Sequence, residues 1–185
     1  MAESLVSDLL RSYRVEEVMV TSVHTARADE SLLSAAKTMR THHVSGLPVI
    51  DPIGHVLGVL SEKDIVSKLD HQVGVGHARG ILDLLLAWYE PKQKDALQRS
   101  VAALLNGLVK EAMSTPAITI AADAPLAEAW HLLRKHTINR IPVVRNGVLA
   151  GIVTRQNVLG VLDTSATAAD LRAAAPPRGG KVPGA

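Results

Sequence analysis

The chain contains one unit twice, and this internal repeat limits how it can fold more than any other feature. When residues 15–49 are aligned with residues 109–143, thirteen of the 35 positions are identical, whereas unrelated sequences would share about two. Further along, the offset between the copies falls from 94 to 93 at a turn, within residues 51–55 of the first copy and around residues 145–147 of the second. Both of these stretches contain turn-forming residues, and turns tolerate changes of length. The repeat therefore predicts two copies of one supersecondary unit.

Each copy has the same order of predicted elements, β-α-β-β-α. A short extended segment leads to an aspartate that suits a helix N-cap, Asp29 or Asp123. An apolar stripe at helical spacing follows, then two apolar runs that flank a turn, and then a second helix. In the second copy, Asn146-Gly147 is a strong signal for a β-hairpin. We therefore expect an α/β (α+β) fold in which tandem repeats pack their sheet faces together with pseudo-two-fold symmetry.

The repeats divide the chain into five predicted segments. Residues 1–14 form an N-terminal helical segment, residues 15–70 the first repeat and residues 108–164 the second. The apolar residues of 71–107 have helical spacing, so we expect a helical insertion that serves as a packing or dimerisation surface. Docking of a partner is the alternative for this insertion. Residues 165–185 are rich in Ala, Pro and Gly, which is typical of a disordered tail.

Composition argues against several classes of function. The 20 Lys and Arg residues nearly balance the 18 Asp and Glu residues, and only 2% of residues are aromatic, so binding of nucleic acid is disfavoured. The absence of cysteine excludes thiol chemistry and suits a cytoplasmic protein. We see no run of the roughly 20 apolar residues that a membrane span needs and no secretory signal. Because the common catalytic loop motifs are also absent, we expect no enzymatic activity.

The sequence around the two predicted hairpins resembles the cystathionine-β-synthase (CBS) domain pair, also called the Bateman module. The first copy reads His-Val-Ser-Gly-Leu-Pro-Val-Ile-Asp at 43–51 and Gly-Val-Leu-Ser-Glu-Lys-Asp at 58–64. The second copy reads Ile-Asn-Arg-Ile-Pro-Val-Val at 138–144 and Gly-Ile-Val-Thr-Arg-Gln-Asn at 151–157. The resemblance covers most of both repeats, and the stretch at 71–107 departs from the compact linker of the family.

The resemblance implies a regulatory binding module. Domains of this family bind adenosine-containing ligands, namely AMP, ADP, ATP or S-adenosylmethionine, in two clefts between the repeats, and Mg²⁺ can accompany the nucleotide. Family modules usually pair, so a homodimer is expected, and the signal would pass in trans to a protein partner. The alternatives are a protein that binds nucleic acid and one that only dimerises, with its clefts empty.

The resemblance also implies site residues. The family motif Gly-h-x-[Ser/Thr]-x-x-Asp falls on Gly58, Ser61 and Asp64, where the carboxylate would hold the ribose hydroxyls and Ser61 would lie near the phosphate. Further contacts are expected at the start of each repeat, at the residues up to each hairpin proline, and at the motif of the second copy. They are Thr21, Ser22, Val23, Val44, Ser45, Gly46, Pro48, Thr115, Ala117, Ile138, Asn139, Arg140, Pro142, Thr154 and Asn157.

The two predicted clefts are not equivalent. Asn157 takes the place of Asp64, and an amide offers a single acceptor oxygen and no charge, so we expect the Asp64 cleft to be the better ribose site. Arg140 is the best phosphate clamp in either cleft, and Gly46 stands at that position in the first copy. On the alternative reading, Ser61 and Asp64 only cap a helix and Arg140 is a surface residue.

Three histidines near predicted helix ends, His42, His43 and His136, could be read as metal ligands. No carboxylate is spaced among them to complete a ligand set. We therefore expect solvated helix ends or cleft walls at these positions, and no metal site.

Overall fold

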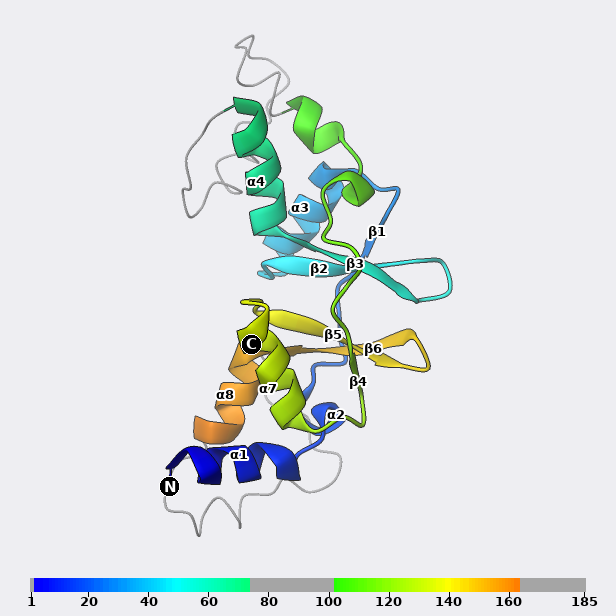
Figure 1. Cartoon of the computed structure of the whole chain (residues 1–185). Coiled ribbons are helices and arrows are strands. Elements are labelled where there is room, and N and C mark those ends of the chain that lie inside the picture. Colours follow the sequence, from blue (N-terminus) through cyan, green and yellow to red (C-terminus); the bar gives the residue numbers. More distant parts are fainter. Residues whose placement is uncertain (1, 74–101, 164–185) are drawn as a thin grey trace. The chain divides into compact units, whose positions relative to one another are not determined.

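The structure, a computed structural model, describes residues 2–73 and 102–163 and divides the chain into two compact units (Figure 1). Unit 1 runs from Met1 to Val23 and from Ile118 to Ala185, and unit 2 is His24–Ala117. The units therefore differ from the sequence repeats in one respect, because the first residues of each repeat belong to the unit that holds the body of the other. The predicted tail and most of the predicted insertion lie outside the described residues.

Unit 2 is built around a three-stranded sheet in the order β1-β2-β3. Its elements are β1 (Ala26–Arg27), α3 (Leu32–Thr41), β2 (Gly46–Ile50), β3 (Val56–Ser61), α4 (Glu62–Val73) and the short 3₁₀-helix η1 (Val109–Glu111). Strand β1 pairs with β2 in parallel, and β2 pairs with β3 antiparallel.

Unit 1 repeats this arrangement with a sheet in the order β4-β5-β6. Its elements are α1 (Ala2–Ser12), α2 (Val15–Val18), β4 (Ile120–Ala121), α7 (Leu126–Lys135), β5 (Arg140–Arg145), β6 (Val148–Thr154) and α8 (Arg155–Asp163). Strand β4 pairs with β5 in parallel, and β5 pairs with β6 antiparallel. The predicted order β-α-β-β-α and the mixed α/β class are confirmed in both units.

The two hairpins turn by different local chemistry. In unit 1, Asn146 and Gly147 have φ angles of 54° and 81°, which is the conformation that a two-residue turn between twisted strands requires. In unit 2, the turn is longer, and Asp51 Oδ1 accepts the backbone N–H groups of Ile53 and His55 at 3.0 and 2.8 Å. The extra residue of the first copy is thus absorbed by an aspartate-stabilised loop.

The expected aspartate N-caps are wrong in both copies, since neither Asp29 nor Asp123 begins a helix. The N-cap of α3 is Ser31, and that of α7 is Pro125, which provides no side-chain cap. Ser31 Oγ accepts the N–H of Ser34 at 3.2 Å, and the first backbone amide of α3 donates to the carbonyl of Gly107 at 2.8 Å. A side chain at the N-cap and backbone from a distant part of the chain therefore both satisfy donors at the start of this helix.

Residues 15–23 and 109–117 are the opening segments of the two repeats, and each completes the unit that holds the body of the other repeat. Val15 N–H donates to a carbonyl just before α7 at 3.0 Å, and its repeat equivalent Val109 donates to a carbonyl just before α3 at 2.9 Å. The exchange therefore obeys the same symmetry as the repeat, with equivalent atoms making equivalent bonds.

The cores of the two units are aliphatic, and both depend on the exchanged chain. Val109 is fully buried among the side chains of α3, β2 and β3, together with Leu104 and Leu105 from the residues before it. In unit 1, Val15 and Val18 are buried beside α7 and the β5–β6 hairpin. Apolar burial thus holds each opening segment in place. Within the described residues, no helix is both long enough and apolar enough to cross a membrane.

Candidate functional site

The predicted motif lies where β3 is followed by α4 in unit 2. Asp64 Oδ2 accepts the backbone N–H of Ser61 at 2.8 Å and the Ser61 hydroxyl at 2.5 Å. Ser61 Oγ in turn faces the Asp64 N–H at 3.3 Å. The two residues therefore cap α4, as the simpler reading of the motif predicted. Capping engages mainly one carboxylate oxygen, so the other oxygen is available for a different partner.

That other oxygen is reached from the opening segment of the second repeat. Ser114 Oγ donates to Asp64 Oδ1 at 3.1 Å. The segment is fixed here because Ser114 and Val59 exchange backbone hydrogen bonds of 3.0 and 2.9 Å, and because the Thr115 hydroxyl donates to Leu57 O at 3.0 Å. The predicted residues Ser61, Asp64 and Thr115 are thus brought to one place, and Ser114 joins them.

Sequence reasoning missed Ser114. It stands directly before the predicted contact Thr115, but its repeat equivalent is the apolar Val20. The available signal was Gly58, because a glycine inside a strand often marks the close approach of another backbone. That signal predicts a crossing without naming the segment that crosses.

The motif glycines leave room for these crossings. A Cβ atom on Gly58 would lie 2.7 Å from Ser114 O and 2.9 Å from Met113 Sδ. A Cβ atom on Gly151 would lie 2.6 Å from Met19 Sδ and 2.9 Å from Val20 O. Both distances to backbone oxygen are too short for a side-chain carbon, so each opening segment can cross its hairpin only over glycine.

Unit 1 has the same motif geometry at the junction of β6 and α8. Asn157 Oδ1 accepts the Thr154 N–H at 2.9 Å and the Thr154 hydroxyl at 2.7 Å. Val20 exchanges backbone hydrogen bonds of 2.9 Å with Ile152, as Ser114 does with Val59. The predicted residues Thr154 and Asn157 are therefore brought together beside the first opening segment, with Val20 at the position of Ser114.

The residue after each motif hydroxyl differs in charge and contacts. In unit 1 this residue is Arg155, whose Nε donates to Ile138 O at 2.9 Å and whose Nη2 donates to Leu133 O at 2.8 Å. The guanidinium thereby ties α8 to the last turn of α7 and to the chain that follows it. The carbonyl of Ile138, a predicted contact residue, is consequently already engaged. In unit 2 the equivalent residue is Glu62.

The hairpin register places Arg140 beside the unit 1 motif. Arg140 is opposite Thr154 in the β5–β6 ladder, and Gly46 is opposite Ser61 in the β2–β3 ladder. The side chain of Arg140 is half-buried. The register therefore pairs the motif hydroxyl residue with an arginine in one unit and with a glycine in the other.

The other predicted contact residues lie next to these elements. Ser45 accepts the backbone N–H of Glu62 at 3.2 Å, and Asn139 accepts that of Arg155 at 3.1 Å, both through their carbonyl oxygens. The rest are in loops or strands adjoining the two motifs: Val44 before β2, Pro48 within β2, Pro142 within β5, Thr21, Ser22 and Val23 after the crossing in unit 1, and Ala117 after the crossing in unit 2.

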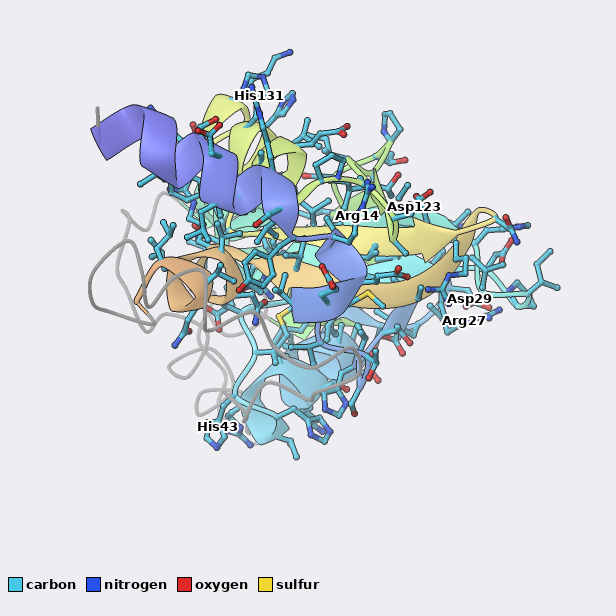
Figure 2. The ribbon with its side chains drawn as sticks, turned by 90° about the horizontal axis from the view of Figure 1, so that it is seen from below. Arg14, Arg27, Asp29, His43, Asp123 and His131 are labelled. Atoms are coloured by element: carbon cyan, nitrogen blue, oxygen red, sulfur yellow. The ribbon has the colours of Figure 1, made fainter. Side chains whose placement is uncertain are left out.

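The histidines occupy helix ends, as expected. His42 and His136 are the exposed C-caps of α3 and α7, and His43, labelled in Figure 2, follows at the end of α3. The ring of His42 also stacks on that of His24, with centroids 3.5 Å apart and planes inclined by 15°. Among the described residues, no group of three or more His, Cys, Asp or Glu side chains is arranged to hold a metal ion.

Comparison with known proteins agrees with this geometry. The sequence model of the CBS domain matches residues 15–71 and 109–164. An uncharacterized protein of Methanocaldococcus jannaschii is 26% identical over 162 residues, which make up 86% of this chain and 34% of that protein. The chain therefore spans about a third of the length of this relative.

Two solved structures have a similar fold. One is the CBS domain of a CBS domain-containing membrane protein from Sphaerobacter thermophilus, with a TM-score of 0.63 and 26% identity, covering 86% of this chain and 93% of that chain. The other is CBSX2 in complex with AMP, with a TM-score of 0.60 and 25% identity, covering 81% of this chain and 96% of that chain. The predicted family resemblance is confirmed.

Proposed function

Because this chain belongs to the CBS domain family, we propose that it is a regulatory module, not an enzyme, and that it binds an adenosine-containing ligand. The candidates are AMP, ADP, ATP and S-adenosylmethionine, with Mg²⁺ accompanying a di- or triphosphate. The ligand acts through a homodimer on a protein partner in trans. The observation that carries the proposal is the pair formed by Asp64 and Ser114. CBSX2, a protein of similar fold, was crystallised with AMP, which supports this ligand class.

Asp64 and Ser114 together are chemically matched to a ribose diol. A carboxylate has about four lone-pair positions, and protein donors take two on Oδ2 and one on Oδ1. The Ser114 hydroxyl gives its proton to Asp64 and keeps lone pairs that accept. One ribose hydroxyl can thus donate to Asp64 Oδ1 while its neighbour donates to Ser114 Oγ. Hydrogen bonds to a charged acceptor are about twice as strong as neutral ones.

The same pair offers a route to regulation. A ligand shifts a conformational equilibrium only by the difference between its affinities for the two states. Asp64 and Ser114 are 50 residues apart in the sequence, and they meet because the second opening segment crosses β3. A ligand held by both side chains favours the conformation in which this crossing is made. Just beyond the crossing, at Ile118, the chain leaves unit 2 for unit 1.

Isothermal titration calorimetry with AMP, ATP and S-adenosylmethionine tests the proposal. Asp64→Ala should abolish binding, and Ser114→Ala, which leaves the helix cap intact, should weaken it by about tenfold. Asp8→Ala, which removes an exposed carboxylate from α1, is the matched control and should bind as the wild type does. Absence of heat with all three compounds at millimolar concentration would overturn the proposal.

Light scattering on the same samples separates binding from assembly. Because Asp64→Ala also removes a cap worth about 1 kcal/mol, its far-UV circular dichroism and melting curve establish that it is folded. A dimer that persists in every variant while the wild type binds no ligand would favour the purely dimerising alternative.

A further inference from the structure

We propose that the two motif sites differ in the ribose they accept. The Asn157 site of unit 1 takes an adenine nucleotide with a phosphate on its 2′ or 3′ oxygen, and the Asp64 site of unit 2 rejects such a ligand. The inference rests on the proposed function, because it assumes that an adenosine-type ligand uses both motif positions. It adds a ligand class for unit 1 and assigns selectivity to Asn157.

The orientation of the Asn157 amide follows from its neighbours. A backbone N–H can only donate, so the Asn157 atom that lies 2.9 Å from the Thr154 nitrogen is the carbonyl oxygen Oδ1. The same oxygen also accepts the Thr154 hydroxyl at 2.7 Å. Capping α8 therefore uses both lone pairs of the only acceptor that the amide has. What remains to face a ligand is Nδ2, which carries two donor hydrogens and no lone pair.

In the part of the chain that the structure describes, no neighbouring group accepts a hydrogen bond from Nδ2. In unit 2, Ser114 supplies a hydroxyl to the second oxygen of Asp64, but the equivalent residue in unit 1 is Val20. Among the described residues, Asn157 Nδ2 has no hydrogen-bond partner. The half-buried Asn157 side chain thus presents a donor where Asp64 presents an acceptor.

The charges around the two motifs differ in the same sense. At the start of α4, Glu62 and Asp64 carry negative charge against the single positive charge of Lys63, and Gly46 is opposite Ser61. At the start of α8, Arg155 is positive, its neighbours Gln156 and Asn157 are neutral, and Arg140 is opposite Thr154. The residues that begin α4 therefore carry a net negative charge, and those that begin α8 carry a net positive charge.

These observations together set the ligand preference. A free diol donates protons to a carboxylate, whereas a phosphate ester offers only acceptors and repels a carboxylate. In dinucleotide-binding folds, an acidic side chain holds the ribose hydroxyl and a cationic one accommodates a 2′-phosphate. Asn157 Nδ2 can only donate, and a phosphate is a charged and therefore stronger acceptor than a hydroxyl, so its site favours the phosphorylated ribose over the free diol of AMP. Asp64 accepts only the diol.

Calorimetry with AMP, adenosine 2′,5′-bisphosphate and adenosine 3′,5′-bisphosphate tests this selectivity. At least one bisphosphate should bind the wild type, and its binding should survive in Asp64→Ala. Asn157→Asp should weaken bisphosphate binding by at least about tenfold, because an acceptor and a like charge replace a donor, and it should not weaken AMP binding. The carboxylate can still accept from Thr154, so α8 keeps its cap, which a melting curve checks. Gln156→Glu, which adds the same charge at an exposed neighbour, should cost much less.

The outcomes separate this inference from the function on which it rests. If AMP binds and requires Asp64, but neither bisphosphate binds or Asn157→Asp leaves their affinity unchanged, the selectivity inference is overturned and the proposed function stands. If none of the three compounds binds, both are overturned. Bisphosphate binding that depends on Asn157 supports the inference whether AMP proves tight or weak.

Discussion

The two motif sites have the same backbone geometry and differ in the chemistry of their side chains. In both units an opening segment crosses the second hairpin strand over a glycine and exchanges a pair of hydrogen bonds with it, at Val59 or at Ile152. In both, a hydroxyl residue and the residue three positions later cap the helix that follows. The side chains that remain are Asp64 with Ser114 in one unit and Asn157 with Val20 in the other.

The comparison shows which features of the repeat are constrained. The crossing, the glycine and the cap are bound by backbone geometry, so they match in both copies. The second atom of the capping side chain and the side chain that crosses beside it take no part in that geometry. They are free to diverge, and they are also the atoms that the proposed ligands would contact. A duplicated unit can thus acquire two chemically different sites without a change of fold.

The largest expected effect tests the shared crossing. We expect Gly58→Ala to destabilise the protein by about 3 kcal/mol, because the new Cβ would meet the backbone oxygen of Ser114 at 2.7 Å. Gly151→Ala should cost less, since its nearest neighbour is the flexible side chain of Met19 and the backbone oxygen of Val20 lies at 2.9 Å. Urea denaturation measures both values.

The matched control is Gly160→Ala in α8, where a Cβ would meet nothing within 4 Å. This change should stabilise the protein slightly, because alanine favours a helix more than glycine does. If Gly58→Ala proved as stable as Gly160→Ala, the opening segment would not be held against β3 as described.

The next largest expected effect tests the difference between the residues that begin α4 and α8. Arg155→Ala should destabilise by about 2 kcal/mol, because it leaves the carbonyls of Ile138 and Leu133 without their charged donor. Arg155→Lys should recover only part of this loss, since a single ammonium group lacks the planar fork that reaches both carbonyls. Thermal denaturation provides the measurement.

Glu62→Ala changes the equivalent position in unit 2 and should alter stability by no more than about 0.5 kcal/mol. Equal losses in Arg155→Ala and Glu62→Ala would mean that the two helix starts are held in the same way, against the asymmetry seen in their contacts.

Local sequence patterns were sufficient to predict the order of the helices and strands and the positions of the two motifs. The apolar runs on either side of each turn predict the hairpins, and the Asn146-Gly147 pair adopts the left-handed angles expected of it. The cap at Ser61 and Asp64 depends on residues three positions apart, so it too is readable from sequence. These features involve neighbours, and neighbours leave a signal in spacing.

The exchange of opening segments left no such signal. It depends on backbone pairing between residues far apart, as between Ser114 and Val59, and backbone groups are common to every residue. The expected caps at Asp29 and Asp123 were wrong because both aspartates lie in turns, two residues before the N-caps Ser31 and Pro125. Ser114 could not be chosen from the repeat, since its equivalent, Val20, lacks a hydroxyl.

The smallest effect concerns Glu30, whose repeat equivalent in unit 1 is Ala124. Burial raises the pKa of Glu30 above its ordinary value of 4.5, so the native state binds this proton more tightly than the unfolded chain does. The contribution of Glu30 to stability is therefore full below pH 4.5 and is lost as the pH rises through the raised pKa.

Glu30→Gln should be more stable than the wild type at neutral pH, by no more than about 0.5 kcal/mol because the side chain is partly exposed. In urea denaturation the difference should vanish below pH 4.5. The prediction would be contradicted by a variant less stable than the wild type at neutral pH. The hydrogen bonds of the carboxylate to Arg27 and Ser34, which lower the pKa, would then outweigh its burial. The ionised side chain would in that case favour the folded form of unit 2.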